Sequence, residues 1–96
     1  MGLLSEKHSA ELGDHTIEVL AKNHVWRGVV YTLFFDGVEV AAARNFWKIP
    51  TRRTLEARVI VDGTERHIVV AVRQHWLWCE FILAIDGEPL ALELAK

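Results

Sequence analysis

Histidine and cysteine side chains are the groups of this chain that could bind a metal ion. Zinc sites need three or four such ligands converging at close spacing. No two histidines lie within six residues of each other. His75 and Cys79 are four positions apart, which in a strand separates them by about 13 Å. We therefore predict no metal site and interpret the histidines as scattered surface residues, namely His8, His15, His24, His67 and His75.

Few other side chains of this chain could carry out catalysis. Cys79 is in phase with Phe81 and Leu83 on an apolar face, so we expect a buried, inert thiol rather than a nucleophile. Ser5 and Ser9 are the only serines, and both fall in an expected tail, which argues against a serine-triad hydrolase. The sequence has no glycine-rich phosphate loop and no Walker lysine. We therefore predict no enzymatic activity and no cofactor.

Two glutamates near the end of the chain could form a carboxylate pair. We expect Glu80 and Glu93 to lie cross-strand on the outward face of the last hairpin. Paired carboxylates can perform acid–base chemistry, but on an outward face they are more typical of a solvated surface. We therefore assign them no catalytic role.

The strongest candidate for a binding surface is a basic and aromatic segment. Residues 44–58 contain five cations and one acid, Glu56. Such a segment could bind an acidic protein segment, single-stranded nucleic acid or an anionic membrane surface. We rank these partners in that order because the net charge is −2 and the patch is small. The candidate interaction surface consists of Arg44, Phe46, Trp47, Lys48, Arg52 and Arg53.

The four tryptophans fall near predicted strand ends or connections. Tryptophan is rarely fully buried and is enriched at contact hot spots. These side chains could therefore belong to a recognition surface, or they could fill the two open ends of a β-sandwich. The residues are Trp26, Trp47, Trp76 and Trp78.

Length, charge and cysteine content limit the class of protein. A chain of 96 residues makes one domain. It contains no run of about 18 apolar residues and no signal-peptide pattern, so we expect no membrane span. A single cysteine cannot form an intrachain disulfide, which favours a reduced, cytoplasmic setting. The net charge of −2 argues against a general nucleic-acid binder.

Three Asp-Gly pairs determine how the chain positions these side chains. An Asp-Gly pair between apolar runs is the strongest short-range signal for a hairpin with a type I′ turn. We therefore predict three hairpins, over residues 26–46, 55–73 and 79–94, and a first strand over residues 15–22. The pairs are Asp36-Gly37, Asp62-Gly63 and Asp86-Gly87.

A two-residue loop also predicts which residues lie opposite each other. In the third hairpin, Pro89 has no N–H to donate, so we expect the last strand to be a sheet edge there. In that hairpin we expect one apolar face made of Cys79, Phe81, Leu83, Ile85, Leu90, Leu92 and Leu94. Elsewhere the predicted opposite pairs are Phe35 with Val38, Leu33 with Val40, Tyr31 with Ala42, Val61 with Thr64, Val59 with Arg66, Ala57 with Ile68, and Leu55 with Val70.

These hairpins predict an all-β fold. Three hairpins and one further strand can bury their apolar faces against one another, and two antiparallel sheets are the natural solution. We predict a β-sandwich of about seven strands, with a small β-barrel as the alternative. Residues 1–14 are expected to form a mobile N-terminal tail, and residues 15–96 a single β-sandwich domain.

Several short segments of the chain occur in the order of a known family. They are His15-Thr16-Ile17-Glu18-Val19, then residues 27–31, 35–39 and 46–47, and finally residues 78–90. Over residues 15–92 this order resembles the β-sandwich domain of the Fas apoptotic inhibitory molecule family. The chain departs from the family in an insertion at residues 32–35, in a longer middle hairpin, and in having room for one domain where the family typically carries two. The resemblance implies a non-enzymatic, soluble intracellular domain that acts through protein contacts.

The leading function hypothesis is therefore a protein-interaction module similar to that domain. A sheet edge can accept a strand from a partner or from a second copy, so homodimerisation is a further hypothesis. One alternative is nucleic-acid or anionic-ligand binding through residues 44–58. Another is a small apolar ligand carrier with a pocket between the sheets.

Overall fold

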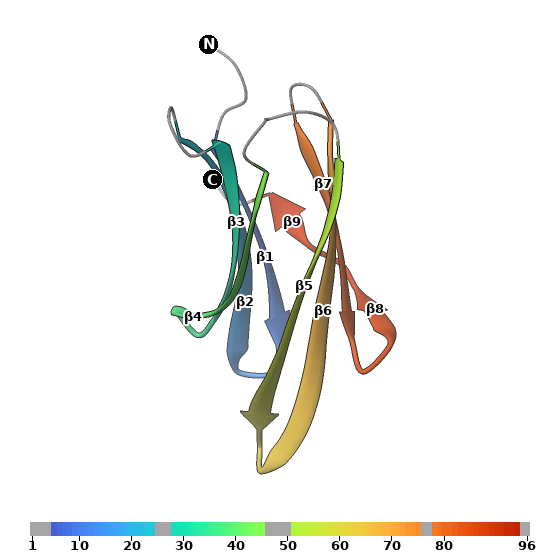
Figure 1. The fold of residues 1–96 in the computed structure, drawn as a ribbon. Helices are drawn as coiled ribbons and strands as arrows, with labels where there is room; N and C mark the ends of the chain where they lie inside the picture. Colours follow the sequence, from blue (N-terminus) through green and yellow to red (C-terminus); the bar gives the residue numbers. More distant parts are fainter. Residues whose placement is uncertain (1–4, 25–27, 46–50, 76–77, 95–96) are drawn as a thin grey trace.

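The computed structural model describes residues 5–24, 28–45, 51–75 and 78–94, which form an all-β structure. The predicted β-sandwich is confirmed, and the structure is not the closed barrel that the sequence also allows (Figure 1). In the described part of the chain, no helix is long and apolar enough to cross a membrane. The strands are β1 (Glu6–Leu12), β2 (His15–His24), β3 (Gly28–Phe35), β4 (Val38–Asn45), β5 (Thr51–Val61), β6 (Thr64–Gln74), β7 (Cys79–Ile85), β8 (Glu88–Leu90) and β9 (Glu93–Leu94).

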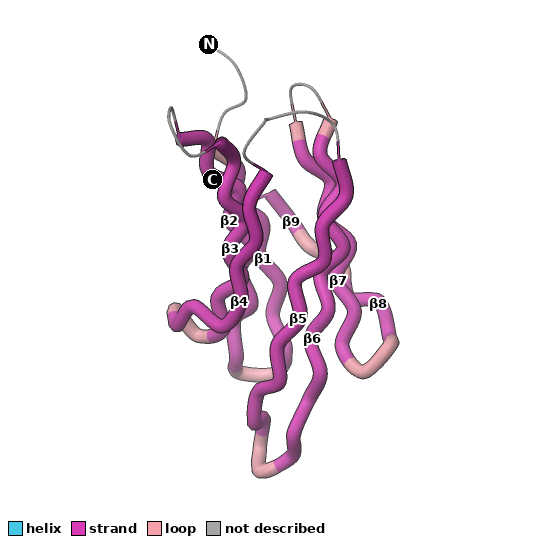
Figure 2. The backbone as a smooth tube through the Cα atoms, in the orientation of Figure 1, coloured by secondary structure: helices cyan, strands magenta, loops and turns pink. Residues whose placement is uncertain are grey.

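Two antiparallel sheets face each other in the sandwich. Sheet A has the strand order β4-β3-β2-β1-β9, and sheet B has the order β5-β6-β7-β8. Consecutive strands are neighbours in both sheets, so each half of the chain folds as a four-stranded meander, after which β9 returns to pair with β1 (Figure 2). The described residues contain nine strands rather than about seven. The additional strands are β1, in the predicted tail, and β9, which is separated from β8.

The prediction that residues 1–14 form a mobile tail is wrong for β1. This strand pairs with β2 along its whole length. A tight turn joins the two strands, with Gly13 at a φ of 60°. The inward positions of β1 are Glu6, His8, Ala10 and Leu12, and two of these are polar. The apolar alternation that identifies a half-buried strand is therefore weak in this segment.

All three Asp-Gly pairs form the predicted two-residue turns. The φ angles are 51° and 82° at Asp36-Gly37, 51° and 80° at Asp62-Gly63, and 50° and 85° at Asp86-Gly87. Positive φ at both central residues is the signature of the type I′ turn. The three turns lie at one end of the sandwich, which we call the turn end (Figure 1).

The predicted register of the second hairpin is confirmed along its length, from Val61 opposite Thr64 to Leu55 opposite Val70. Because the two-residue turn sets the alternation, Leu55 and Val70 both face the core. The turn chemistry therefore determines which face of this long hairpin is buried.

The first hairpin follows the prediction only beside its turn, where Phe35 lies opposite Val38. Further along, Leu33 lies opposite Ala41 and Tyr31 opposite Ala43, so the predicted pairs Leu33 with Val40 and Tyr31 with Ala42 are wrong. A β-bulge shifts the register between Leu33 and Phe34. A bulge places two residues of one strand opposite one of the other, and the two-residue turn gives no sign of it.

The last hairpin confirms one prediction and corrects another. Pro89 lies in β8, which is the edge strand of sheet B as expected. The chain then crosses to sheet A, where Glu93 lies opposite Ser9 of β1. Glu80 lies instead in sheet B, opposite Arg73. The expected cross-strand pair of Glu80 and Glu93 is therefore wrong, because the last strand leaves its hairpin partner after Leu90.

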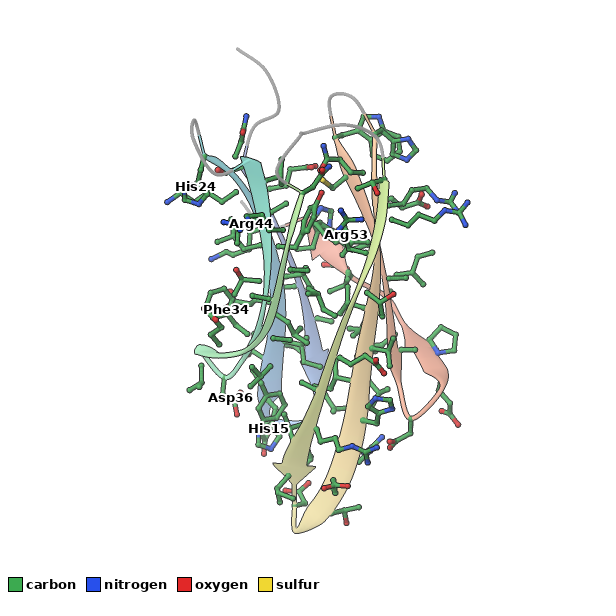
Figure 3. The ribbon with its side chains drawn as sticks, viewed as in Figure 1. His15, His24, Phe34, Asp36, Arg44 and Arg53 are labelled. Atoms are coloured by element: carbon green, nitrogen blue, oxygen red, sulfur yellow. The ribbon has the colours of Figure 1, made fainter. Side chains whose placement is uncertain are left out.

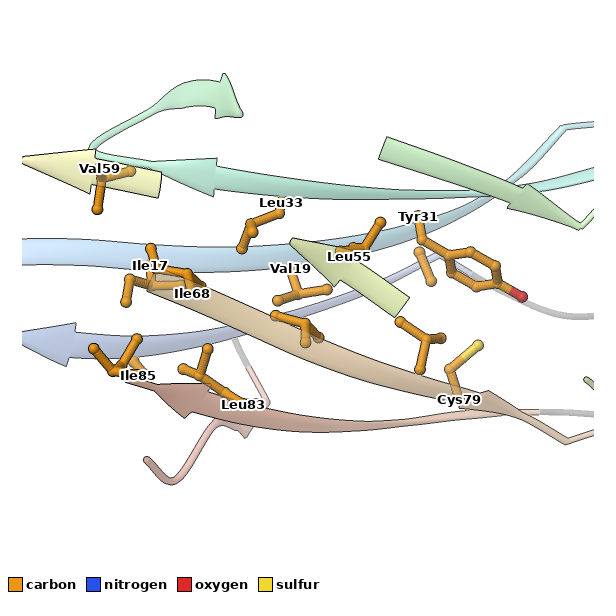
Figure 4. Close-up of a cluster of buried hydrophobic side chains, with 14 of the residues drawn as sticks. Ile17, Val19, Tyr31, Leu33, Leu55, Val59, Ile68, Cys79, Leu83 and Ile85 are labelled. Carbon is orange, nitrogen blue, oxygen red and sulfur yellow. The ribbon is translucent and has the colours of Figure 1, made fainter. Parts of the chain in front are cut away.

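The core lies between the two sheets. Side chains of sheet A and sheet B point toward each other there (Figure 4). Full burial of a Val, Leu, Ile or Phe side chain stabilises a fold by roughly 1.5–3 kcal/mol, so this layer is the main source of stability. The largest fully buried apolar side chains are Tyr31, Ile17, Leu33, Leu55, Ile68, Leu83, Val19, Val29, Val70 and Val72.

Two of the turn aspartates also bind the strand next to their hairpin. Asp36 Oδ1 accepts a hydrogen bond from Thr16 N at 2.8 Å, and Asp36 N donates to Thr16 O at 2.8 Å. Asp86 repeats this arrangement in the other sheet, where its Oδ1 accepts from His67 N at 2.9 Å and its N donates to His67 O at 2.8 Å. The first and third turns are thereby attached to β2 and β6.

Candidate functional site

The end of the sandwich opposite the turn end holds the residues that border the longer connections. We call it the loop end. The strand order places several strand boundaries there, because β2, β4 and β6 end at it and β1, β3, β5 and β7 begin at it (Figure 1). The bordering described residues are His24, Gly28, Asn45, Thr51, His75 and Trp78.

The predicted interaction surface is only partly visible at the loop end. Phe46, Trp47 and Lys48 lie outside the described residues. Arg44 is exposed near the end of β4, beside the inward-facing Asn45, so it belongs to the outer face of sheet A. Arg52 is exposed on β5 and belongs to the outer face of sheet B. The structure therefore places these two arginines on opposite faces of the sandwich.

Arg53 lies between the sheets, next to Arg44 (Figure 3). Its Nε donates to the carbonyl oxygen of Arg44 at 3.2 Å. Its Nη1 donates to Thr51 Oγ1 and to the carbonyl oxygen of Arg52, both at 2.9 Å. The bond to Arg44 connects β4, an edge strand of sheet A, to β5, an edge strand of sheet B, and the other two lie within β5. The guanidinium of Arg53 is thus engaged in holding β4 beside β5.

Arg52 has a second arginine as its cross-strand neighbour. It lies directly opposite Arg73 on β6. Arg73 Nη1 lies 3.8 Å from Glu80 Oε1 on β7, whereas the guanidinium of Arg52 has no hydrogen bond or ion pair with any described residue. Like charges directly opposite each other destabilise a sheet. Arg52 therefore leaves a positive charge on this face that forms no ion pair with a described residue.

Aromatic and apolar side chains continue this surface. The rings of His75 and Trp78 stack at a centroid distance of 3.9 Å with 20° between their planes. His75 Nε2 also lies 3.7 Å from Glu80 Oε1. Trp78 is 50 % exposed and Ile82 is 55 % exposed. Ile82 borders a hollow of about 170 Å³ that Arg52, Arg53 and Arg73 also line.

We call this surface the Arg52–Trp78 face and define it by six residues. They are Arg52, Arg73, His75, Trp78, Glu80 and Ile82. The sequence identifies Arg52 and draws attention to Trp78, but it does not bring in Arg73 or Ile82. The signal that could have found them is register, because Arg52, Arg73 and Glu80 form one row across three strands.

A buried polar network lies beneath the loop end. Tyr31 Oη donates to Gln74 Oε1, and Asn45 Nδ2 donates to the same oxygen at 3.1 Å. The three side chains come from β3, β4 and β6, so the network joins the two sheets. Burial raises the pKa of Tyr31 to about 12. The phenol therefore stays protonated at neutral pH and serves as a hydrogen-bond donor.

The predicted burial of Cys79 is confirmed, since this residue is 3 % exposed. Glu6 Oε2 accepts a hydrogen bond from the backbone N of Cys79 at 2.7 Å. Burial first, and then the negative charge of Glu6, raises the pKa of the Cys79 thiol to about 12. The thiolate that nucleophilic chemistry requires is therefore scarcely populated at neutral pH. The sequence gives no sign of this contact, because Glu6 lies in the segment expected to form a tail.

Four histidines lie beside carboxylates rather than free on the surface. The pairs are His15 with Asp36, His67 with Glu56, His75 with Glu80, and His8 with Glu6. His8 differs most from the expected surface position, because its side chain faces inward. Its ring meets the ring of Phe81 edge-on, with 4.8 Å between the ring centroids. Within the described ranges, no group of three or more metal-binding side chains lies close enough to hold an ion.

Comparison with known proteins does not extend this description. The chain matches no protein-family model, no curated protein and no solved structure.

Proposed function

We propose that this protein is a non-enzymatic protein-interaction module that binds an acidic segment of a partner protein through the Arg52–Trp78 face. One observation carries the proposal: Arg52 and Arg73 share a row with Glu80, half-exposed Trp78 and Ile82 lie two positions either side of Glu80, and Arg52 has no partner among the described residues. Tryptophan and arginine are the side chains most enriched at binding hot spots. Glu80 already pairs with Arg73, so the free positive charge of the face is centred on Arg52.

The resemblance to the Fas apoptotic inhibitory molecule family supports the same class of function. The role it implies is contact with other proteins inside the cell, in the cytoplasm.

Selection from a displayed library of random peptides tests the proposal, because it needs no identified partner. We expect the retained peptides to place Asp or Glu beside an aromatic or aliphatic residue. Arg52→Glu should weaken the binding of a selected peptide about tenfold or more, because it replaces a charge-assisted hydrogen bond with repulsion. Trp78→Ala should weaken it comparably.

Lys22→Glu is the matched control, since Lys22 is exposed on the outer face of sheet A. It makes a charge change of the same kind as Arg52→Glu and should leave peptide binding unchanged. Circular dichroism and thermal unfolding of each variant establish that it is folded. Peptides that bind all four proteins equally, or no enrichment at all, would contradict the proposal.

Binding of an anionic ligand or of single-stranded nucleic acid is a second candidate function. The adjacent guanidinium groups of Arg52 and Arg73 favour it, because such a pair suits a phosphate. Counterion release then predicts affinity for a labelled oligonucleotide that falls steeply between 50 and 200 mM salt. No binding at low salt would eliminate this candidate. The third hypothesis, an apolar ligand carrier, gains no support from the hollows of the described residues, which lie at the surface.

A further inference from the structure

Strand β5 presents a long unpaired edge. Among the strands of the described residues it pairs only with β6, and it forms one border of sheet B. It has 11 residues, compared with 8, 3 and 2 in the other edge strands β4, β8 and β9. In Figures 1 and 2 the part of β5 near the turn end lies clear of β4. This edge therefore offers backbone groups to another strand.

The turn determines which backbone groups are available on this edge. Val61 and Thr64 close the Asp62-Gly63 turn and so form a hydrogen-bonded pair. In an antiparallel ladder, hydrogen-bonded and non-hydrogen-bonded pairs alternate. Every second residue of β5 therefore directs its N–H and C=O away from β6. These residues are Arg52, Thr54, Glu56, Arg58 and Ile60.

The side chains at these positions are self-complementary in one antiparallel register. If the two-fold axis passes beside Ala57, Glu56 of each copy lies opposite Arg58 of the other. Thr54 then lies opposite Ile60 in both directions. This register also brings together positions whose backbone groups face the open edge, so the hydrogen bonds form as well. Opposite charges in facing positions stabilise a strand pair.

The neighbouring registers that satisfy the same hydrogen bonds are unfavourable. An axis at Glu56 places the two copies of Glu56 opposite each other. An axis at Arg58 does the same for two arginines. An axis at Leu55 places Arg52 opposite Arg58. Like charges directly opposite each other are destabilising, so the charge order of β5 selects the register centred on Ala57.

We propose that two copies of this chain associate through their β5 edges in the register centred on Ala57, forming one continuous eight-stranded sheet from the two four-stranded sheets B.

The local structure fits this partner. Ala57 would face its own copy at a non-hydrogen-bonded position, where strands approach most closely and a small side chain is needed. A shallow hollow of about 490 Å³ lies here, lined by Glu56, Ala57, Arg58 and His67. Ile60 is 63 % exposed in the single chain and would gain a neighbour.

Glu56 and Arg58 are already oriented by partners on β6. Arg58 Nη1 lies 3.1 Å from Glu65 Oε2, and Glu56 Oε1 lies 3.1 Å from His67 Nε2. A guanidinium has five N–H donors and a carboxylate has two oxygens. Each side chain therefore keeps hydrogen-bonding capacity for the second copy.

Charge reversal tests the proposal by sedimentation equilibrium over a range of concentrations. We expect the wild type to dimerise, and Glu56→Arg or Arg58→Glu to raise the dimer dissociation constant by about tenfold or more, because two attractive pairs become repulsive. The double variant Glu56→Arg/Arg58→Glu should restore dimerisation. A mixture of the two single variants should form a heterodimer, since each then supplies the charge that the other lacks.

Glu11→Arg, at an exposed position of β1, is the matched control and should dimerise like the wild type. A second measurement tests the register itself. Ala57→Cys should form a disulfide-linked dimer under mild oxidation, because the two copies of residue 57 lie at the axis within disulfide distance. Thr54→Cys should not, because its own copy lies further along the strand. The wild type serves as background, since Cys79 is buried.

A wild type that stays monomeric at all concentrations would overturn the proposal. So would dimers that ignore the charge reversals, since they would use another surface. Charges on an open edge also discourage association with strands of other proteins. If the wild type is monomeric, this protective role is the one left for Glu56 and Arg58. The Trp78→Ala arm of the peptide selection is decided independently of this result, because Trp78 lies beside the start of β7, two strands away from the β5 edge.

Discussion

The side chain of His15 donates from Nδ1 to Asp36 Oδ2 at 2.6 Å, and this pair joins the start of β2 to the first type I′ turn. The other carboxylate oxygen of Asp36 accepts the backbone N–H of Thr16 at 2.8 Å. The ring of His15 also stacks on Phe35 at a centroid distance of 5.1 Å. One carboxylate thus holds a turn, a backbone group and a titratable ring together.

This pair predicts a dependence of stability on pH. The hydrogen bond to Asp36 raises the pKa of His15 above its ordinary value of 6.5, and the same bond lowers the pKa of Asp36 below its ordinary value of 3.8. A group with a raised pKa stabilises the fold below its unfolded pKa and loses that contribution as the pH rises through the folded pKa. A group with a lowered pKa contributes above its unfolded pKa and loses it as the pH falls through the folded pKa.

We therefore expect the His15–Asp36 contribution to be largest between about pH 4 and 6.5. Urea midpoints measured from pH 2 to 9 should fall on both sides of this window. Asp36→Asn keeps an acceptor for Thr16 N but removes the charge, so it should abolish the fall on the alkaline side.

Asp86→Asn is the matched comparison for this prediction. Hydrogen bonds from His67 N and Arg66 lower the pKa of Asp86, and the charge of His67 is the smallest contribution. Among the described residues, no histidine ring donates a hydrogen bond to Asp86, in contrast to Asp36. Asp86→Asn should reduce the loss of stability at acid pH. The fall in the urea midpoint above about pH 6.5 should stay as in the wild type. A wild-type profile that is flat from pH 5 to 9 would refute the assignment to His15.

Ala10 tests whether β1 belongs to the fold. It is buried against β2, so Ala10→Asp would place a charge in the core and should lower the free energy of unfolding by at least about 2 kcal/mol. The adjacent Glu11 is exposed, and Glu11→Lys should change the free energy of unfolding by less than about 0.5 kcal/mol. Equal effects at the two positions would support a tail instead. The measurement is chemical denaturation of both variants at one pH.

Tyr31 tests the buried network of the loop end. Tyr31→Phe removes the donor to Gln74 Oε1, which keeps its bond from Asn45. We expect a loss of about 1 kcal/mol, the usual net value of one hydrogen bond. Leu33→Ala, which opens a cavity in the same strand, should cost about 2–5 kcal/mol. A Tyr31→Phe protein as stable as the wild type would show that the hydroxyl contributes nothing net.

Gly63 tests the conformational requirement of the middle turn. Its φ is 80°, and an added Cβ would meet no atom within 4 Å. Any cost of Gly63→Ala is therefore conformational, and we expect about 1–2 kcal/mol. Gly63→Asn should cost less, because asparagine tolerates positive φ. Thermal unfolding of the two variants measures the difference, and equal costs would show that φ is not the cause.

Local patterns in the sequence predict the elements that local chemistry controls. The Asp-Gly pairs predict three type I′ turns, and the second hairpin follows its turn in perfect alternation as far as Leu55. The burial of Cys79 follows from the same alternation. These predictions succeed because a turn and its register depend on residues that are adjacent in the chain.

The errors arise where distant segments decide the outcome. Glu6 and His8 are polar, yet they face inward, because β2 pairs with β1 and Cys79 N supplies a hydrogen-bond donor to Glu6. The β-bulge of the first hairpin and the crossing of β9 to sheet A likewise have no local sequence signature.

The candidate site shows the same division. Residue types alone identify Arg52 as part of a binding surface, and the tryptophans as either contact residues or core filling. The pairing of β5, β6 and β7 then places Arg73 and Ile82 beside Arg52, and it separates Arg44 to the other face. Side chains close in sequence were enough to predict the hairpins, the buried faces and the all-β class. Only the packed sheets separate Arg44 from Arg52, because the two residues lie on β4 and β5, and the outer face that each joins depends on the sheet to which its strand belongs.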